Sequence, residues 1–120
     1  MVIVDTSVWI DHFRTDNDIL KELLTDAEVV CHPFVIGELA CGNLKKRNEI
    51  LTLLEALPSA PVVNEEEIRF FVEKNELMGK GIGLLDVYLL AASVISAIPL
   101  WTMDKRLRSA AKELDVAYDN

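Results

Sequence analysis

Four acidic residues stand at positions where a carboxylate needs a chemical reason. Asp86 heads the apolar run GIGLLDVYLLAASVI, and Glu38 has no basic residue three or four positions away on its expected helix. Asp5 directly follows the apolar run MVIV, and Asp104 follows shortly after the apolar triplet PLW. A buried carboxylate without a partner is costly unless it is protonated, solvated or matched to a cation.

A divalent cation is the partner that would suit such a set of acids. Two carboxylates about 5 Å apart repel each other by roughly 3 kcal/mol at an effective dielectric of about 20. Ligand sets made only of oxygen atoms suit Mg²⁺ or Mn²⁺ rather than zinc. A cation of this kind polarises a phosphoryl oxygen, lowers the pKa of a bound water and orients an in-line attack on phosphorus. The acids therefore indicate metal-assisted hydrolysis of phosphodiesters.

Helix capping is the alternative explanation for the three aspartates. Aspartate is a preferred N-cap residue, and a cap stabilises a helix by about 1 kcal/mol. For any one aspartate alone, capping is the favoured interpretation, but it does not explain Glu38, which lies in the middle of a helix. Ser7 and Thr102 lie near Asp5 and Asp104 in the chain. Their hydroxyl groups could support the acids by hydrogen bonds, or serve equally well in turns and caps.

The elements that must position these acids alternate between short β-rich runs and longer helical ones. This alternation predicts one α/β domain over residues 1–120, a layered sandwich with a parallel sheet. We expect strands at 1–4, 28–31, 61–63, 99–101 and 116–118, and helices at 7–13, 18–25, 34–41, 46–57, 64–78, 85–97 and 105–114. In such sheets the ligand crevice lies beyond the carboxyl ends of the strands. Asp5 and Asp104 should therefore project from one edge, and Asp86, in the first turn of its helix, can face it.

Other features of the sequence point to the cytoplasm. Cys31 and Cys41 form neither a CxxC motif nor a disulfide framework, which is typical of a reducing compartment. The opening MVIVD lacks the cationic stretch of a signal peptide, and the apolar run from Val87 to Leu100 is too short to span a bilayer.

His12 and His32 have no ligand-like spacing, so we expect no metal role for them.

The net charge of −8 argues against a nucleic-acid partner unless the acids are concentrated in a cation site. Setting aside the four acids leaves 12 basic against 16 acidic residues. The basic residues are also clustered, at Lys45, Lys46 and Arg47 and, after Asp104, at Lys105, Arg106, Arg108 and Lys112. These clusters fit contacts with a phosphate backbone and fit equally the solvated faces of helices.

Four segments taken together, MVIVDTSVWID, ELACG, GIGLLDVYLLAAS and LWTMDKRLRSAA, resemble a PIN-domain nuclease of the VapC toxin type over essentially the whole chain. The resemblance implies a PIN-like three-layer sandwich, in which a central parallel sheet of about five strands is flanked by helices. It also implies a Mg²⁺ or Mn²⁺ site of Asp5, Glu38, Asp86 and Asp104, and endoribonuclease activity that leaves a 5′-phosphate and a 3′-hydroxyl. The implied partners are an RNA substrate, a VapB-type antitoxin and a second copy in a homodimer. Many PIN domains carry a further acid two residues after the last one, where this chain has Arg106, so the number of metal ions stays open.

Two other classes of protein are alternatives to a nuclease. A signalling receiver domain needs an acidic pair at the first strand and a phospho-acceptor aspartate after a middle strand. MVIVDTS supplies one acid and EVVCHP supplies none after its strand, so this class fails. A non-catalytic interaction module with the PIN fold, acting by binding RNA or protein, remains the alternative, and the presence of all four acids counts against it.

Overall fold

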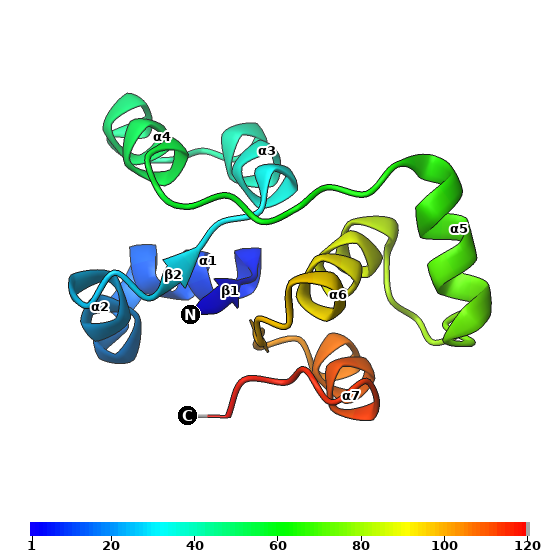
Figure 1. Ribbon diagram of the computed structural model, residues 1–120. Coiled ribbons are helices and arrows are strands. Elements are labelled where there is room, and N and C mark those ends of the chain that lie inside the picture. The colour runs from blue at the N-terminus through cyan, green and yellow to red at the C-terminus, as the bar shows by residue number, and fades with distance from the viewer. Residues whose placement is uncertain (120) are drawn as a thin grey trace.

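A short parallel sheet runs through the centre of the computed structural model, which describes residues 1–119 (Figure 1). Its strands are β1 (Val2–Val4), β2 (Val29–Val30) and β3 (Leu100–Trp101), in the order β2-β1-β3. Every residue of these strands is buried. Strands covered by helices on both faces read as continuous apolar runs, which explains why all three contain only apolar residues.

The edge beyond β2 differs from the sequence-based expectation of five strands. The expected strand at 61–63 is wrong, because the chain touches this edge two residues earlier, through a single parallel bridge between Cys31 and Ser59. The parallel register would next require the N–H of residue 58 to bond Val29 on one side of the bridge, and the N–H of residue 33 to bond Ala60 on the other. Both positions are proline, which has no backbone N–H, and a helix begins at Pro33, so pairing cannot extend in either direction.

The opposite edge is reduced in the same way. The expected strand at 116–118 forms only a bridge between Leu100 and Ala117. Leu100 donates a backbone hydrogen bond to Val116 and accepts one from Tyr118, at 2.8 and 2.9 Å. Because β3 itself has only two residues, the ladder ends there, and three strands are found in residues 1–119 rather than about five.

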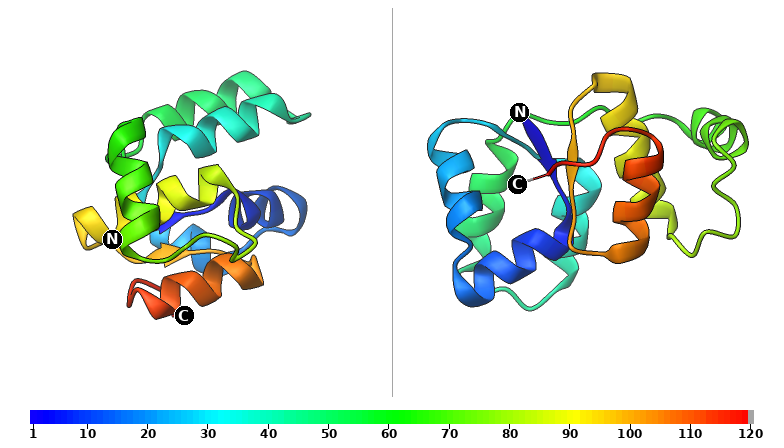
Figure 2. Two further views of the ribbon diagram at one scale, coloured as in Figure 1. Left: turned by 90° about the vertical axis from the view of Figure 1, so that its right-hand side faces the viewer. Right: turned by 90° about the horizontal axis from the view of Figure 1, so that it is seen from below.

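Seven helices of the described residues surround the sheet, and Figures 1 and 2 show their layers. The pair α3 and α4 lies on one side of the sheet, α7 lies on the opposite side, and α5 stands at the outer edge against α6. Their bounds are α1 Thr6–Thr15, α2 Asp18–Thr25, α3 Pro33–Cys41, α4 Arg47–Glu55, α5 Glu65–Lys74, α6 Leu84–Ser96 and α7 Lys105–Glu113. The parallel sheet between helical layers confirms the predicted fold class.

Helix α5 begins as the sequence predicts and ends earlier. The side chains of Asn64 and Glu67 each accept a hydrogen bond from the other's backbone N–H, which completes the expected capping box. The expected end at Met78 is wrong, because the helix stops at Lys74. The backbone turns into the left-handed region at Glu76, where φ is 52°, and this conformation ends the helical ladder.

Helix α6 is buried at the centre of the domain, as its apolar sequence predicts, but its last turn is not buried. Residues 87–93 are all buried. The last turn emerges from the core, and Val94 and Ile95 are exposed. No helix in residues 1–119 is long and apolar enough to cross a membrane.

His32 caps α3 from a fully buried position. Its Nδ1 accepts a hydrogen bond from the backbone N–H of Phe34 at 3.0 Å, which assigns the proton to Nε2. Burial lowers the pKa of His32 from 6.5 to about 4. Protonation would place a charge in the core and a proton on the nitrogen that now accepts the capping bond.

We expect the contribution of His32 to stability to depend on pH. Because the pKa is depressed in the folded state, this contribution is complete above pH 6.5 and is lost as the pH falls towards 4. The full loss corresponds to roughly 3 kcal/mol. The variant His32→Asn keeps a capping side chain but does not titrate. Denaturant unfolding at pH 7.5 and pH 4.5 should show the advantage of the wild type over this variant shrinking on acidification. A difference in stability between the wild type and His32→Asn that does not change with pH would contradict the lowered pKa of His32.

Candidate active site

The pairing of β1 with β3 brings Asp5 and Thr102 together at the carboxyl edge of the sheet. The strands are parallel, with Val4 opposite Trp101, so the next residues of both strands leave the sheet side by side. The Thr102 hydroxyl donates to Oδ2 of Asp5 at 2.7 Å, and the Ser7 hydroxyl donates to the same oxygen at 2.7 Å. Because Asp5 and Thr102 are buried, these bonds fix the orientation of the Asp5 carboxylate.

Asp104 is tied to the same network through its backbone and also caps a helix. Its N–H donates to the Thr102 hydroxyl at 3.0 Å. Its Oδ1 accepts from the N–H groups of Arg106 and Leu107, at 2.9 and 3.1 Å, so the capping interpretation holds for Asp104. Asp5 occupies the N-cap position of α1, but its side chain makes no capping hydrogen bond. Its carboxylate instead accepts hydrogen bonds from the hydroxyl groups of Ser7 and Thr102.

Glu38 reaches this edge from α3 through a residue that the sequence analysis missed. The Thr6 hydroxyl donates to Oε1 of Glu38 at 2.8 Å and so joins the start of α1 to the exposed face of α3. The only signal for Thr6 in the sequence is its place beside Asp5 in the DTS turn. Its partner lies 32 residues away, a separation at which local patterns carry no information.

Asp86 lies in the first turn of α6, where Gly83 and not Asp86 holds the N-cap position. The partly buried carboxylate accepts a hydrogen bond from the Gly83 N–H at 3.4 Å. The pKa of Asp86 is raised from 3.8 to about 6, first by burial and then by the negative charge of Asp5, with smaller contributions from Asp104 and Glu38, against the lowering effect of Gly83. The other three acids therefore all act on Asp86.

The four carboxylates share one pattern of hydrogen bonding. Each has one oxygen that accepts a bond from the chain and a second that, among residues 1–119, accepts none: Oδ1 of Asp5, Oε2 of Glu38, Oδ1 of Asp86 and Oδ2 of Asp104. None of the four forms an ion pair within the described chain. Oxygen donors of net negative charge fit a hard divalent cation.

The side chains do not stand as a closed metal cage. Within residues 1–119, no group of three or more histidine, cysteine, aspartate or glutamate side chains is arranged to hold a metal ion directly. Glu38 and Asp104 are exposed, whereas Asp5 is buried and fixed by two hydroxyl groups. Ligation by all four would therefore need rotation of the two exposed side chains towards Asp5 and Asp86.

A cleft of about 820 Å³ opens beside Glu38, and basic side chains lie along it. Its lining includes Glu38 together with Arg14, Lys45 and Lys46. Arg47, the third member of the predicted basic cluster, does not line the cleft, and its guanidinium donates to the carbonyl of Gly42 at 3.4 Å. Two of the three clustered residues thus share a cleft with one of the four acids.

The second basic cluster lies on the exposed surface of α7, directly after Asp104. Lys105, Arg106 and Arg108 are all exposed, and Arg108 forms an ion pair with Asp119 at 3.4 Å. The Arg106 side chain covers Gly81 so closely that a Cβ there would lie 2.7 Å from its Nη1. Gly81 also has a φ of +75°, and it is this left-handed backbone that favours glycine there, since the flexible Arg106 side chain can move away from a Cβ.

Short parallel strands that end at a cluster of carboxylates, with helices on both sides, define the class of PIN domains. Residues 2–113 match the PIN-domain family, and the chain belongs to it. Within that family it is similar to two proteins named Ribonuclease VapC32, from Mycobacterium tuberculosis strains CDC 1551 / Oshkosh and ATCC 25618 / H37Rv. Each is 46% identical over 118 residues, which cover 98% of this chain and 95% of the relative. The resemblance expected from the four sequence segments is confirmed.

The burial of the Asp86 carboxylate, together with the negative charge around it, predicts that Asp86 destabilises the metal-free protein. Because its pKa is raised, its charge carries no cost below pH 3.8 and the full cost above about pH 6. In chelator at pH 8, the neutral isostere Asp86→Asn should be more stable than the wild type, by about 1 to 2 kcal/mol after allowing for solvent screening.

Thermal unfolding in chelator between pH 4 and pH 8 would test this expectation, with Asp18→Asn as the control. Asp18 also lies in the first turn of a helix, but it is exposed on α2. A lower stability of Asp86→Asn at pH 8, or an equal gain in the control, would contradict the electrostatic reading.

Proposed function

We propose that this protein is a Mg²⁺- or Mn²⁺-dependent endoribonuclease and the toxin of a type II toxin–antitoxin pair. The site is formed by Asp5, Glu38, Asp86 and Asp104, which would hold the metal ion and direct hydrolysis of an RNA phosphodiester. The observation that carries the proposal is the pattern of one fixed and one available oxygen on each carboxylate. The relatives named ribonuclease support the same activity.

The chain itself contributes orientation and charge. A bound Mg²⁺ or Mn²⁺ supplies Lewis acidity towards a phosphoryl oxygen and lowers the pKa of a bound water. Ser7 and Thr102 hold the Asp5 carboxylate in one orientation, and Thr6 holds one oxygen of Glu38. Such outer hydrogen bonds orient ligands and tune their affinity for the metal. The site collects negative charge that only a cation or a proton can offset.

RNA binding by a chain of net charge −8 must depend on local positive charge. We assign the RNA backbone to two surfaces that adjoin the acids, the cleft beside Glu38 and the start of α7. Lys45 and Lys46 line the cleft and Arg47 follows them in the chain outside it, while Lys105, Arg106 and Arg108 lie at the start of α7. Backbone binding of this kind releases counterions, so RNA affinity should fall steeply as the salt concentration rises.

The relatives' VapC name and the matching segments support three further proposals. The protein is neutralised by a VapB-type antitoxin, it forms a homodimer, and it works in the cytoplasm as a single PIN domain. A cytoplasmic location is in keeping with an RNA substrate and with the free thiols of Cys31 and Cys41.

Incubation of the partner-free protein with total cellular RNA tests the proposed activity. With Mg²⁺ or Mn²⁺ we expect discrete new 5′ ends, mapped by sequencing. They should disappear in chelator and fall by roughly 100-fold or more in Asp86→Asn, because loss of a ligand removes several kcal/mol of charge stabilisation. The control variant Asp18→Asn should cleave like the wild type.

Two results of this experiment would count against the proposal. Cleavage by Asp86→Asn at the rate of the wild type would remove Asp86 from the site. A folded protein supplied with metal that cuts none of the RNAs would instead favour the interaction module that acts by binding.

The hydroxyl network gives a finer prediction about metal affinity. Thr102→Val removes a donor to Asp5 and the acceptor of the Asp104 N–H. We expect it to weaken Mn²⁺ binding by about 10- to 100-fold, measured by isothermal titration calorimetry. Thr102→Ser keeps the hydroxyl and should bind nearly as the wild type does. Equal affinities of the Val and Ser variants would show that the network does not support the metal.

A further inference from the structure

The Arg106 side chain connects α7 with the segment that leads into α6. Arg106 lies two residues after Asp104, and its backbone N–H donates to Oδ1 of that carboxylate at 2.9 Å. Its side chain extends over Gly81, where its Cδ and Cζ would lie 3.1 and 3.2 Å from a Cβ on that glycine. Gly81 lies two residues before Gly83, whose N–H donates to Oδ2 of Asp86. The side chain therefore joins the two segments that carry Asp104 and Asp86.

The guanidinium of Arg106 has no partner of opposite charge within residues 1–119. It forms no ion pair there. The side chains of Arg47 and Arg108 each donate a hydrogen bond to a protein oxygen, whereas that of Arg106 donates none inside the described chain. Contact with Gly81 accounts for the position of this side chain but not for its charge, because glycine offers no side-chain acceptor.

This arrangement suits an arginine that binds an anion beside the acids. An arginine paired directly with the carboxylates would compete with a cation for their oxygens. Arg106 instead adjoins two of the acids without forming an ion pair with either. Its planar guanidinium thus keeps five N–H donors, and their fork geometry matches two oxygens of a phosphate group.

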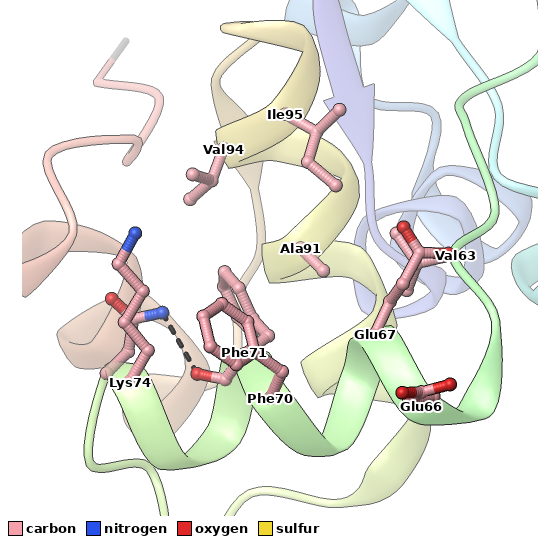
Figure 3. A pocket seen from close by; sticks show the side chains of 10 residues that line it. Val63, Glu66, Glu67, Phe70, Phe71, Lys74, Ala91, Val94 and Ile95 are labelled. Atoms are coloured by element: carbon pink, nitrogen blue, oxygen red, sulfur yellow. Dashed lines mark hydrogen bonds between the residues drawn. The ribbon is translucent and has the colours of Figure 1, made fainter.

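The two largest hollows in the described part of the chain bind phosphate elsewhere or poorly. An apolar groove of about 470 Å³ between α5 and α6 is lined by Glu66, Glu67 and a single basic residue, Lys74 (Figure 3). Its two acids would repel a phosphate. The basic cleft beside Glu38 does not include Arg106 in its lining. Positive charge therefore adjoins the site twice, next to Glu38 in the cleft and next to Asp104 at Arg106.

We propose that Arg106 is a catalytic residue, whose guanidinium binds the non-bridging oxygens of the scissile phosphate. In the hydrolysis the oxygen of water bonds to phosphorus and the bond from phosphorus to the 3′ oxygen breaks. The water loses one proton and the 3′ oxygen gains one, so no further reactant is needed. Hydrogen bonds from the guanidinium stabilise the negative charge of the phosphoryl group in the transition state. The inference rests on the proposed nuclease function and gives Arg106 a role beyond holding the RNA backbone.

Steady-state cleavage of an RNA oligonucleotide that spans a mapped cut site would test this role. In Arg106→Gln we expect kcat to fall by about 100-fold and KM to stay within about 3-fold of the wild type, because the contact strengthens in the transition state. Arg106→Lys keeps the charge but not the fork and should lose about 10-fold in kcat. In Arg108→Gln, which removes a charge of the same helix, the main effect should be a higher KM.

Arg69→Gln is a matched control for the loss of an arginine. Arg69 is exposed on α5 and lines neither the groove nor the basic cleft. Its replacement should leave kcat and KM as in the wild type.

Mn²⁺ binding, measured by isothermal titration calorimetry, separates contact with phosphate from support of the metal site. The Arg106 side chain donates to none of the four carboxylates within the described residues. The Mn²⁺ affinity of Arg106→Gln should therefore stay within about 3-fold of the wild type, whereas loss of a residue that orients a ligand costs about 10- to 100-fold.

The outcomes distinguish this inference from the nuclease proposal. A kcat of Arg106→Gln equal to that of Arg69→Gln, a loss confined to KM, or a matching loss of Mn²⁺ affinity would overturn the catalytic role and leave the nuclease standing. A wild-type protein that cuts no RNA in the presence of Mg²⁺ or Mn²⁺ would overturn both.

Discussion

The structure of this site depends on holding the partly buried Asp86 carboxylate among three other acids. Asp5, Glu38, Asp86 and Asp104 come from four different places in the chain, and the pKa of Asp86 is raised by burial and then by the charges of the other three. A cluster of this kind opposes folding unless the surrounding structure forces it together. The driving force is supplied away from the acids, by the apolar strands and by the buried centre of α6. Apolar packing in the core thus brings the acids together without any contribution from their charge. A divalent cation would offset the unfavourable electrostatic free energy of the cluster.

Very short strands are enough to position the acids because hydroxyl groups extend the connection beyond the sheet. β1 and β3 pair through only a few residues, yet Thr102 and Ser7 continue the link by bonding the same oxygen of Asp5. Thr102 also accepts from the backbone of Asp104, so one side chain holds two acids in register. Thr6 performs a similar task between α1 and Glu38 on α3. The DTS turn after β1 is therefore both the end of a strand and the support of half the site.

Local patterns in the sequence predicted most helices and the placement of Asp5 and Asp104 at one edge of the sheet, because those features have local causes. The start of α5 follows from its capping box, and the placement of Asp5 and Asp104 follows from their position after buried strands. The features that the sequence analysis missed or placed wrongly have causes outside such local patterns. The edge bridge at Ser59 depends on where β2 lies in space, and the early end of α5 depends on a left-handed residue that is not glycine. The bond from Thr6 to Glu38 and the groove between α5 and α6 depend on contacts distant in sequence.

The central claim is that the four carboxylates share one divalent cation. It is tested most directly by anomalous diffraction from crystals of the protein soaked in Mn²⁺, since the anomalous signal locates manganese without reference to activity. The account predicts a manganese peak at the carboxyl edge of the sheet, within bonding distance of Asp5 and of oxygens from at least two of Glu38, Asp86 and Asp104. A well-occupied manganese ion bound only elsewhere, or an edge that stays free of manganese at saturating concentration, would contradict it.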